Sequence, residues 1–169
     1  MTAYRRLYIP GGTYFFTVAA RQRGSRLLVE RAELLKACIR AEQQRAPFAI
    51  LAAVIMPDHL HMVWRLPAGD SDYPNRWLRI KARFSRALPR SAHAIPDGGP
   101  DKGERGIWQR RYWEHCVRDE AELSVCIGYV HANPVKHGYA GQPQDWPHST
   151  YVAWRRRLSG AAGPSTLPA

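Results

Sequence analysis

The segment from residue 48 to residue 66 constrains the fold of this 169-residue chain more than any other. It opens with a continuous apolar run at 48–56 (FAILAAVIM), turns at Pro57 and Asp58, and continues with an alternating pattern at 59–66 (HLHMVWRL). A short apolar run between turn signals is typical of a buried strand, and alternation is typical of a strand with two different faces. The segment therefore predicts a tight hairpin of two strands at the centre of a sheet.

The remaining elements follow from the same kinds of pattern. Aromatic and β-branched residues predict strands over 12–20 (GTYFFTVAA) and 112–118 (YWEHCVR). Apolar residues at helical spacing predict helices over 30–45 and 73–90, and Asp119 opens a last helix that Pro134 is expected to close. The order β-α-β-β-α-β followed by a helix is that of the ferredoxin-like split βαβ arrangement. We therefore expect an α+β fold, with an antiparallel sheet backed by two helices and a C-terminal helix added to it.

The chain length suits one domain rather than two. We expect residues 1–154 to form that domain and residues 155–169, which are basic and then rich in Gly, Ser and Pro, to be a disordered tail. Residues 91–106 have the composition of a loop. The three cysteines form no paired pattern, and an odd number argues against a disulfide framework.

The charge of the chain indicates its partners. Twenty-five Lys and Arg against 14 Asp and Glu give a formal net charge of +11, which favours nucleic acid or, second, an anionic membrane surface. No apolar run approaches the roughly 20 residues of a membrane helix, and no stretch is typical of a signal peptide. We expect a cytoplasmic, nucleoid-associated protein with no membrane partner. Arginine dominates over lysine, which suits phosphate contacts, although GC-rich coding also enriches arginine.

The helix predicted over 73–90 carries arginines spaced three, four, three and four residues apart, and the segment has no acidic residue. These arginines are Arg76, Arg79, Arg83, Arg86 and Arg90. Solvated helix faces usually alternate in charge sign, so a stripe of one sign favours a face that follows a phosphate backbone. A merely solvated helix face is the alternative.

Two histidines follow the Pro57-Asp58 turn. Because residues two apart in a strand share a face, His59 and His61 project together while Leu60 points the other way. The pair could hold a metal ion between its two imidazoles. The alternative is that both are ordinary surface or core histidines.

The last predicted helix carries a second candidate pair. Tyr129 and Asn133 are four residues apart and share a helical face, where they offer a phenol and an amide oxygen. The phenol could attack an electrophile while the amide binds a metal ion. Alternatively, Tyr129 is an aromatic at the edge of the core and Asn133 ends the helix before Pro134.

Several long motifs occur in order along nearly the whole chain. They lie at 4–6 (YRR), 11–17 (GGTYFFT), 56–67 (MPDHLHMVWRLP), 108–120 (WQRRYWEHCVRDE), 129–138 (YVHANPVKHG) and 145–150 (DWPHST). With these motifs the chain resembles the REP-associated tyrosine transposases, relatives of the smallest insertion-sequence transposases in the HUH superfamily.

The resemblance implies roles for both candidate pairs. It implies that His59 and His61 bind a divalent cation, Mg²⁺ or Mn²⁺, that Asn133 completes the site, and that Tyr129 is the nucleophile. The implied substrate is single-stranded or hairpin DNA of repetitive palindromic elements. The implied intermediate is a 5′-phosphotyrosine with a free 3′-hydroxyl. The general base stays open between water and Asp58.

Basic and aromatic residues are expected to hold the DNA. The residues expected to contact it are Arg5, Arg6, Tyr14, Arg76, Arg79, Arg83, Arg86, Arg110, Arg111 and Lys136, with Tyr4 and Tyr8 as further stacking candidates. Glu114 and His115 either orient the metal ligands or have a plain strand role.

Two rival functions remain open at this point. One is a non-catalytic protein that binds repeat DNA with the same fold, and the other is a metal-dependent nuclease that uses water as its nucleophile. The protein could act as a monomer or as a homodimer.

Overall fold

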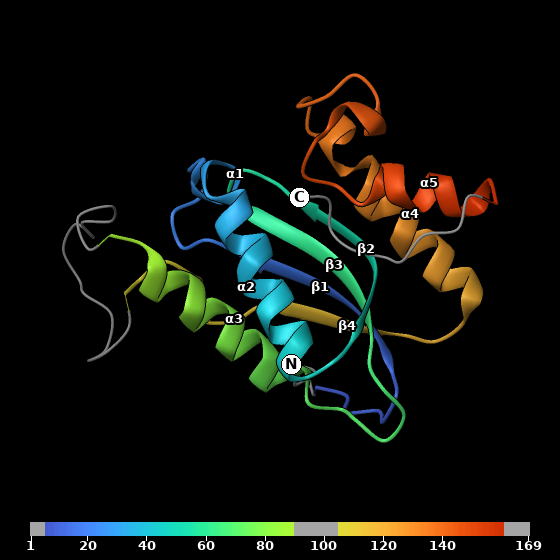
Figure 1. Ribbon diagram of the computed structural model, residues 1–169. Helices are drawn as coiled ribbons and strands as arrows, with labels where there is room; N and C mark the ends of the chain where they lie inside the picture. The colour runs from blue at the N-terminus through green and yellow to red at the C-terminus, as the bar shows by residue number, and fades with distance from the viewer. Residues whose placement is uncertain (1–5, 90–104, 161–169) are drawn as a thin grey trace, which may run out of the picture.

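The computed structural model describes residues 6–89 and 105–160, which form a sheet with helices on both faces (Figure 1). The four strands are β1 (Thr13–Ala19), β2 (Ala49–Ile55), β3 (His59–Arg65) and β4 (Trp113–Val117). They lie in the order β2-β3-β1-β4, and every neighbouring pair is antiparallel. The helices are α1 (Leu27–Glu30), α2 (Ala32–Arg45), α3 (Tyr73–Ala87), α4 (Glu120–Lys136) and α5 (Tyr151–Leu158). The expected α+β fold, an antiparallel sheet backed by two helices with a further C-terminal helix, is confirmed.

Alternation along the strands creates two cores. Tyr14 and Phe16 of β1 join the larger core with α2 and α3, whereas Phe15 points to the opposite face and packs with Val130 of α4. The central hairpin divides in the same way, because Leu60 belongs to the larger core and Val63 to the smaller. The histidines that flank Leu60 therefore face α4, as the period of a strand predicts.

The last predicted helix extends further than expected. α4 continues through Pro134 to Lys136, so the prediction that Pro134 closes it is wrong. Pro134 lies in the final turn, where its missing N–H removes only one helical hydrogen bond. The chain leaves the helix at Gly138, whose φ of 72° is in the left-handed region that glycine adopts without strain. Gly138, rather than Pro134, was the signal for the end of this helix.

The segment after α4 runs along the outer edge of β2. The amide of Ile55 donates to the carbonyl of His148 at 2.9 Å, and the Trp146 indole donates to the carbonyl of Ile55 at 2.9 Å. Thr150 closes the segment, because its backbone amide donates to the carbonyl of Ala53 and its hydroxyl accepts from the amide of Ala53. These bonds cover the sheet edge and explain the structural use of the 145–150 motif.

The start of the expected tail also needs correction. Residue 155 lies inside α5, which continues to Leu158. Trp154 anchors this helix, because its ring centroid lies 5.0 Å from that of His131 in α4. Residues 161–169 of the expected tail, and most of the expected loop at 91–106, lie outside the described residues. All three cysteines are free thiols. Across residues 6–89 and 105–160, no helix combines the length and apolarity required to cross a bilayer.

The junction of α4 with α5 should make folding sensitive to acid. His131 is buried there, its Nε2 lies 3.0 Å from the Thr150 hydroxyl, and burial lowers its pKa from 6.5 to about 4. Unfolded His131 takes up a proton below about pH 6.5, whereas folded His131 does so only below about pH 4. This contribution to stability is complete above pH 6.5 and is lost as the pH falls towards 4. Between pH 7 and pH 5, the wild-type protein should lose about 2 kcal/mol more of its free energy of unfolding than His131→Gln does. Urea unfolding at the two pH values measures this difference.

His137→Gln is the control for this measurement, because His137 is exposed at the end of the same helix. It should keep the loss of stability that His131 causes between pH 7 and pH 5. An unchanged dependence in His131→Gln would show that burial of His131 is not the cause.

Candidate active site

The two histidines of β3 lie side by side on the sheet face that α4 covers. His59 and His61 are both buried, and their ring centroids are 5.0 Å apart. Nδ1 of His59 lies 2.7 Å from the Asp58 carboxylate, and Nδ1 of His61 lies 2.9 Å from the Thr17 hydroxyl. Because these bonds engage Nδ1 of each ring, Nε2 is the nitrogen that each ring can offer to a cation.

Both imidazoles are neutral near pH 7. Burial lowers the pKa of His59 in spite of its bond to Asp58, and burial together with the neighbouring His59 lowers the pKa of His61 to about 3. Burial opposes ionisation of Asp58, but hydrogen bonds from His59 and the amide of Gly24 hold the pKa of its carboxyl below the usual range. Neutral imidazoles are the form that binds metal ions, and Asp58 is engaged in orienting one of them.

Tyr129 of α4 contacts one ring of this pair, that of His61. Its ring centroid is 5.3 Å from that of His61 and 5.8 Å from that of Phe15. The side chain is 41% exposed, so a large substrate can reach it. Lys136 places its Nζ 5.2 Å from the centre of the same ring. The strand motif and the helix motif, far apart in the sequence, thus meet at one place.

Asn133 lies one helical turn after Tyr129 and is fully buried. Neither Oδ1 nor Nδ2 of its amide has a hydrogen-bond partner among the described residues. A buried polar group without a partner is unusual and needs an explanation such as an ion that the amide binds. Two neutral imidazoles and such an amide oxygen fit a divalent cation.

No group of three or more His, Cys, Asp or Glu side chains in the described part of the chain is placed to hold a metal ion. A set of three ligands that includes His59 and His61 would therefore need a different kind of side chain, such as the amide of Asn133. His137 is not among the residues that the sequence patterns single out, yet it is exposed and its ring centroid lies 5.8 Å from that of His59. Its position four residues after Asn133, on the same helical face, could have revealed it.

The arginine stripe divides into different environments. Arg76 is only 2% exposed, and its guanidinium binds the Asp70 carboxylate at 2.5 Å and the carbonyls of Ala46 and Pro47. The prediction that Arg76 contacts DNA is wrong, because its donors are engaged inside the protein. Arg79 pairs with buried Glu42 at 2.7 Å.

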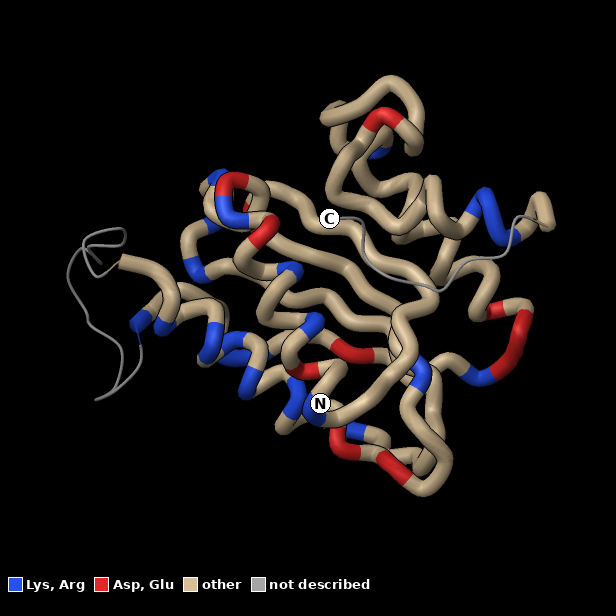
Figure 2. The backbone as a smooth tube through the Cα atoms, in the orientation of Figure 1, with Lys and Arg blue, Asp and Glu red and all other residues tan. Residues whose placement is uncertain are grey.

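The rest of the stripe remains accessible but distant from the histidines. Arg83 and Arg86 are exposed along α3, where Figure 2 shows basic residues in a row. α3 lies on the sheet face opposite α4, so these arginines do not line the Tyr129 site. Arg90 lies outside the described residues.

The other predicted DNA contacts also separate by burial. Tyr14 is fully buried and its hydroxyl bonds to the backbone of Ile9, so its predicted contact with DNA is wrong. Arg6 pairs with buried Glu114 at 3.2 Å and covers the Tyr112 ring. Three predicted residues are exposed, namely Arg110, Arg111 and Lys136. Tyr8 is exposed and stacks on Tyr73, whereas Tyr4 and Arg5 lie outside the described residues.

Glu114 and His115 occupy opposite faces of β4. Glu114 pairs with Phe16 in the register and faces the larger core, so it does not approach the metal-ligand candidates. His115 pairs with Phe15 and faces α4, where its Nε2 lies 2.8 Å from Glu122.

The burial of Arg76 predicts a loss of stability rather than a loss of DNA binding. Arg76→Ala leaves the Asp70 carboxylate and three backbone carbonyls, those of Ala46, Pro47 and Asp72, without this donor. We expect a cost of about 2 to 3 kcal/mol, below that of a fully buried pair because Asp70 is partly exposed. Arg83→Ala, on the exposed side of the same helix, should change stability by about 0.5 kcal/mol or less. Urea unfolding of both variants measures this, and equal stabilities would contradict the structural role of Arg76.

Comparison with known proteins identifies the family of the chain. The chain is 41% identical over 151 residues to the REP-associated tyrosine transposase of Escherichia coli K12, covering 89% of this chain and 83% of the relative. A Haemophilus influenzae relative with the same family name is 36% identical over 151 residues, covering 89% and 86%. The chain matches no model in a scan of protein families. A solved structure of a REP-associated tyrosine transposase bound to a REP hairpin superposes with a TM-score of 0.79 and 36% identity, covering 100% of this chain and 98% of that one.

These relatives place the chain among transposase-type enzymes. More closely, it belongs to the family of REP-associated tyrosine transposases, as its motifs predict.

Proposed function

We propose that this protein cleaves and rejoins single-stranded DNA next to a hairpin, with Tyr129 as the nucleophile. The observation that carries the proposal is the position of Tyr129, which is exposed and lies against the neutral His61 ring, next to which the second neutral imidazole, His59, lies. The relative of known structure is bound to a REP hairpin, which supports repetitive palindromic DNA as the substrate. Such a substrate would bring the protein to the nucleoid.

The proposed step is a transesterification. The Tyr129 phenol loses its proton and its oxygen attacks phosphorus, while the bond between phosphorus and the 3′ oxygen breaks. The 5′-phosphate remains on Tyr129, and the departing 3′-hydroxyl takes up a proton. One phosphodiester replaces another, so the attack of a second 3′-hydroxyl can reverse the step and join strands. No nucleotide cofactor is required.

Nε2 of His59, Nε2 of His61 and the amide oxygen of Asn133 would hold a divalent cation, Mg²⁺ or Mn²⁺. When bound, the cation supplies positive charge that polarises the scissile phosphate. Imidazole ligands favour Mn²⁺ over Mg²⁺ in affinity. Asp58 fixes the orientation of His59 and is therefore a poor candidate for the base, which leaves water. Lys136 provides a second positive charge beside the nucleophile.

The test is a search for a covalent adduct. A hairpin oligonucleotide with single-stranded flanks, labelled at its 3′ end, is incubated with the protein and Mn²⁺ and analysed under denaturing conditions. The proposal expects the label to remain on the protein. Cleavage without an adduct would instead support a hydrolytic nuclease, and binding without cleavage would support a non-catalytic DNA-binding protein.

A further inference from the structure

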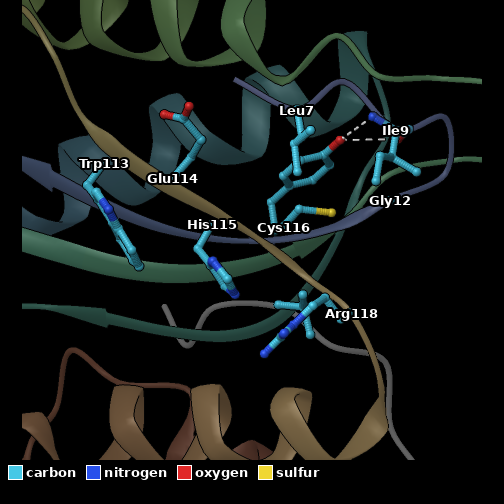
Figure 3. Close-up of a pocket in the computed structure, with 10 residues that line it drawn as sticks. Leu7, Ile9, Gly12, Trp113, Glu114, His115, Cys116 and Arg118 are labelled. Atoms are coloured by element: carbon cyan, nitrogen blue, oxygen red, sulfur yellow. Dashed lines mark hydrogen bonds between the residues drawn. The ribbon is translucent and has the colours of Figure 1, made fainter. Parts of the chain in front are cut away.

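Two parallel rings lie on β4 near the proposed nucleophile. Trp113 and His115 point to the same side of the strand, towards α4, whereas Glu114 between them points the other way (Figure 3). Their ring centroids are 5.8 Å apart and their planes differ by 7°. Trp113 is 50% exposed, unlike Trp64, Trp77 and Trp108, which are all buried. A flat apolar surface is therefore open to solvent on this face.

The rings are connected to the proposed nucleophile through one side chain. The Phe15 ring lies 5.5 Å from the Trp113 ring and 5.8 Å from the Tyr129 ring. Phe15 itself is buried, so it separates the two exposed rings and fixes their distance. If a DNA strand places its scissile phosphate at Tyr129, a nucleotide next to that phosphate, or one further along, would lie at Trp113.

The position of His115 is held by polar contacts. Its Nε2 lies 2.8 Å from the Glu122 carboxylate. The same carboxylate accepts hydrogen bonds from the backbone amide and the guanidinium of Arg118. These hydrogen bonds lower the pKa of Glu122 to about 2, and the bond from the Arg118 side chain has the largest effect. Glu122 is therefore charged at neutral pH. A surface that is already ordered loses little conformational entropy when a ligand stacks on it.

Arginines lie close to the two rings in the sequence, beside acidic residues at the start of α4. Arg118 follows β4 with a largely exposed side chain, and Arg110 and Arg111 precede it as exposed residues. Arg65, half-exposed on β3, faces Glu120 at 3.6 Å. A hollow of about 650 Å³ opens along β4, lined in part by Trp113, His115 and Arg118 (Figure 3). Flat apolar rings among arginines match a ligand with flat bases and a negative backbone.

We propose that Trp113, supported by His115, stacks on a base of single-stranded DNA beside the scissile phosphate. The inference rests on the proposed function, because the strand is placed by its phosphate at Tyr129. Stacking tolerates any base, since every base has a π face, and the site therefore holds the strand without selecting its sequence.

The test couples a change in the protein to a change in the DNA. All proteins carry Tyr129→Phe so that the strand stays intact, and binding is measured to a hairpin with single-stranded flanks. Trp113→Ala should bind about tenfold more weakly, and Trp113→Phe should retain most of the affinity because it keeps a ring. Leu78→Ala is the control, since Leu78 is exposed on α3 at the other face of the sheet. It should bind as the parent does.

A series of oligonucleotides, each with one abasic position in the flank, then locates the contact. At one position the missing base should weaken binding to the parent about tenfold but leave binding to Trp113→Ala unchanged. If the effect of Trp113→Ala and the effect of the missing base add at every position of the flank, the proposed stacking is wrong. It is also wrong if Trp113→Ala binds the hairpin with the affinity of the parent. A parent protein that binds neither hairpin nor single strand would overturn the proposed function and the stacking with it.

Discussion

Replacing Tyr129 with phenylalanine is expected to abolish the covalent adduct and to slow strand cleavage by about three orders of magnitude or more. Phenylalanine keeps the ring that lies against His61 and Phe15 but lacks the oxygen that attacks phosphorus. Stability should change by about 0.5 kcal/mol or less, because Tyr129 is partly exposed and none of its packing is removed. Binding to hairpin DNA should likewise persist. Denaturing gels of 3′-labelled oligonucleotides measure the adduct and the cleavage together.

Tyr139→Phe is the matched control for this prediction. Tyr139 is a second exposed tyrosine just beyond α4, and its ring lies 6.4 Å from that of His137. This variant should form the adduct at close to the wild-type rate. An adduct that survives Tyr129→Phe would show that another residue is the nucleophile, and cleavage that survives without an adduct would show that water attacks instead.

The elements of this fold could be predicted from the sequence because each carries a local signal. The apolar run at 48–56 and the Pro57-Asp58 turn specify the central hairpin, and the period of a strand places His59 and His61 on one face. Helical spacing likewise places Tyr129 and Asn133 together. The contact between the two pairs could not be predicted from spacing, because it depends on how α4 packs on β3. The family resemblance supplied that link.

Burial was harder to predict than secondary structure. The segment 73–90 contains no acidic residue, but the partner of Arg76 is Asp70, which lies before the helix begins. The alternation in β1 is compatible with a sheet that exposes one face and with it the Tyr14 ring. In the structure, helices cover both faces of β1 at this point, and Tyr14 is buried. Trp113 shows the reverse case, an aromatic residue left open because β4 is at the edge of the sheet. These outcomes depend on neighbours that are distant in the sequence.

Replacing Asn133 with leucine is expected to lower Mn²⁺-dependent cleavage by about a hundred-fold or more while raising the stability of the metal-free protein. The amide is buried without a hydrogen-bond partner among the described residues, and such a group costs about 1 to 3 kcal/mol. Leucine of similar volume removes that cost, so the free energy of unfolding should rise by about 1 kcal/mol. Loss of a metal ligand should weaken Mn²⁺ binding, and the stabilisation of the folded protein by Mn²⁺ should shrink with it.

Urea unfolding with and without Mn²⁺, together with single-turnover cleavage, separates these effects. Asn75→Leu is the control, because Asn75 is the other asparagine of the chain and is exposed on α3. It should leave cleavage and the response to Mn²⁺ unchanged. A metal-free Asn133→Leu protein that is less stable than the wild type would show that the amide has a structural partner. A more stable variant that still cleaves at the wild-type rate would show that Asn133 does not bind the cation and that the two histidines hold it without the amide. An amide whose removal stabilises the protein and leaves cleavage unchanged has no part in the reaction.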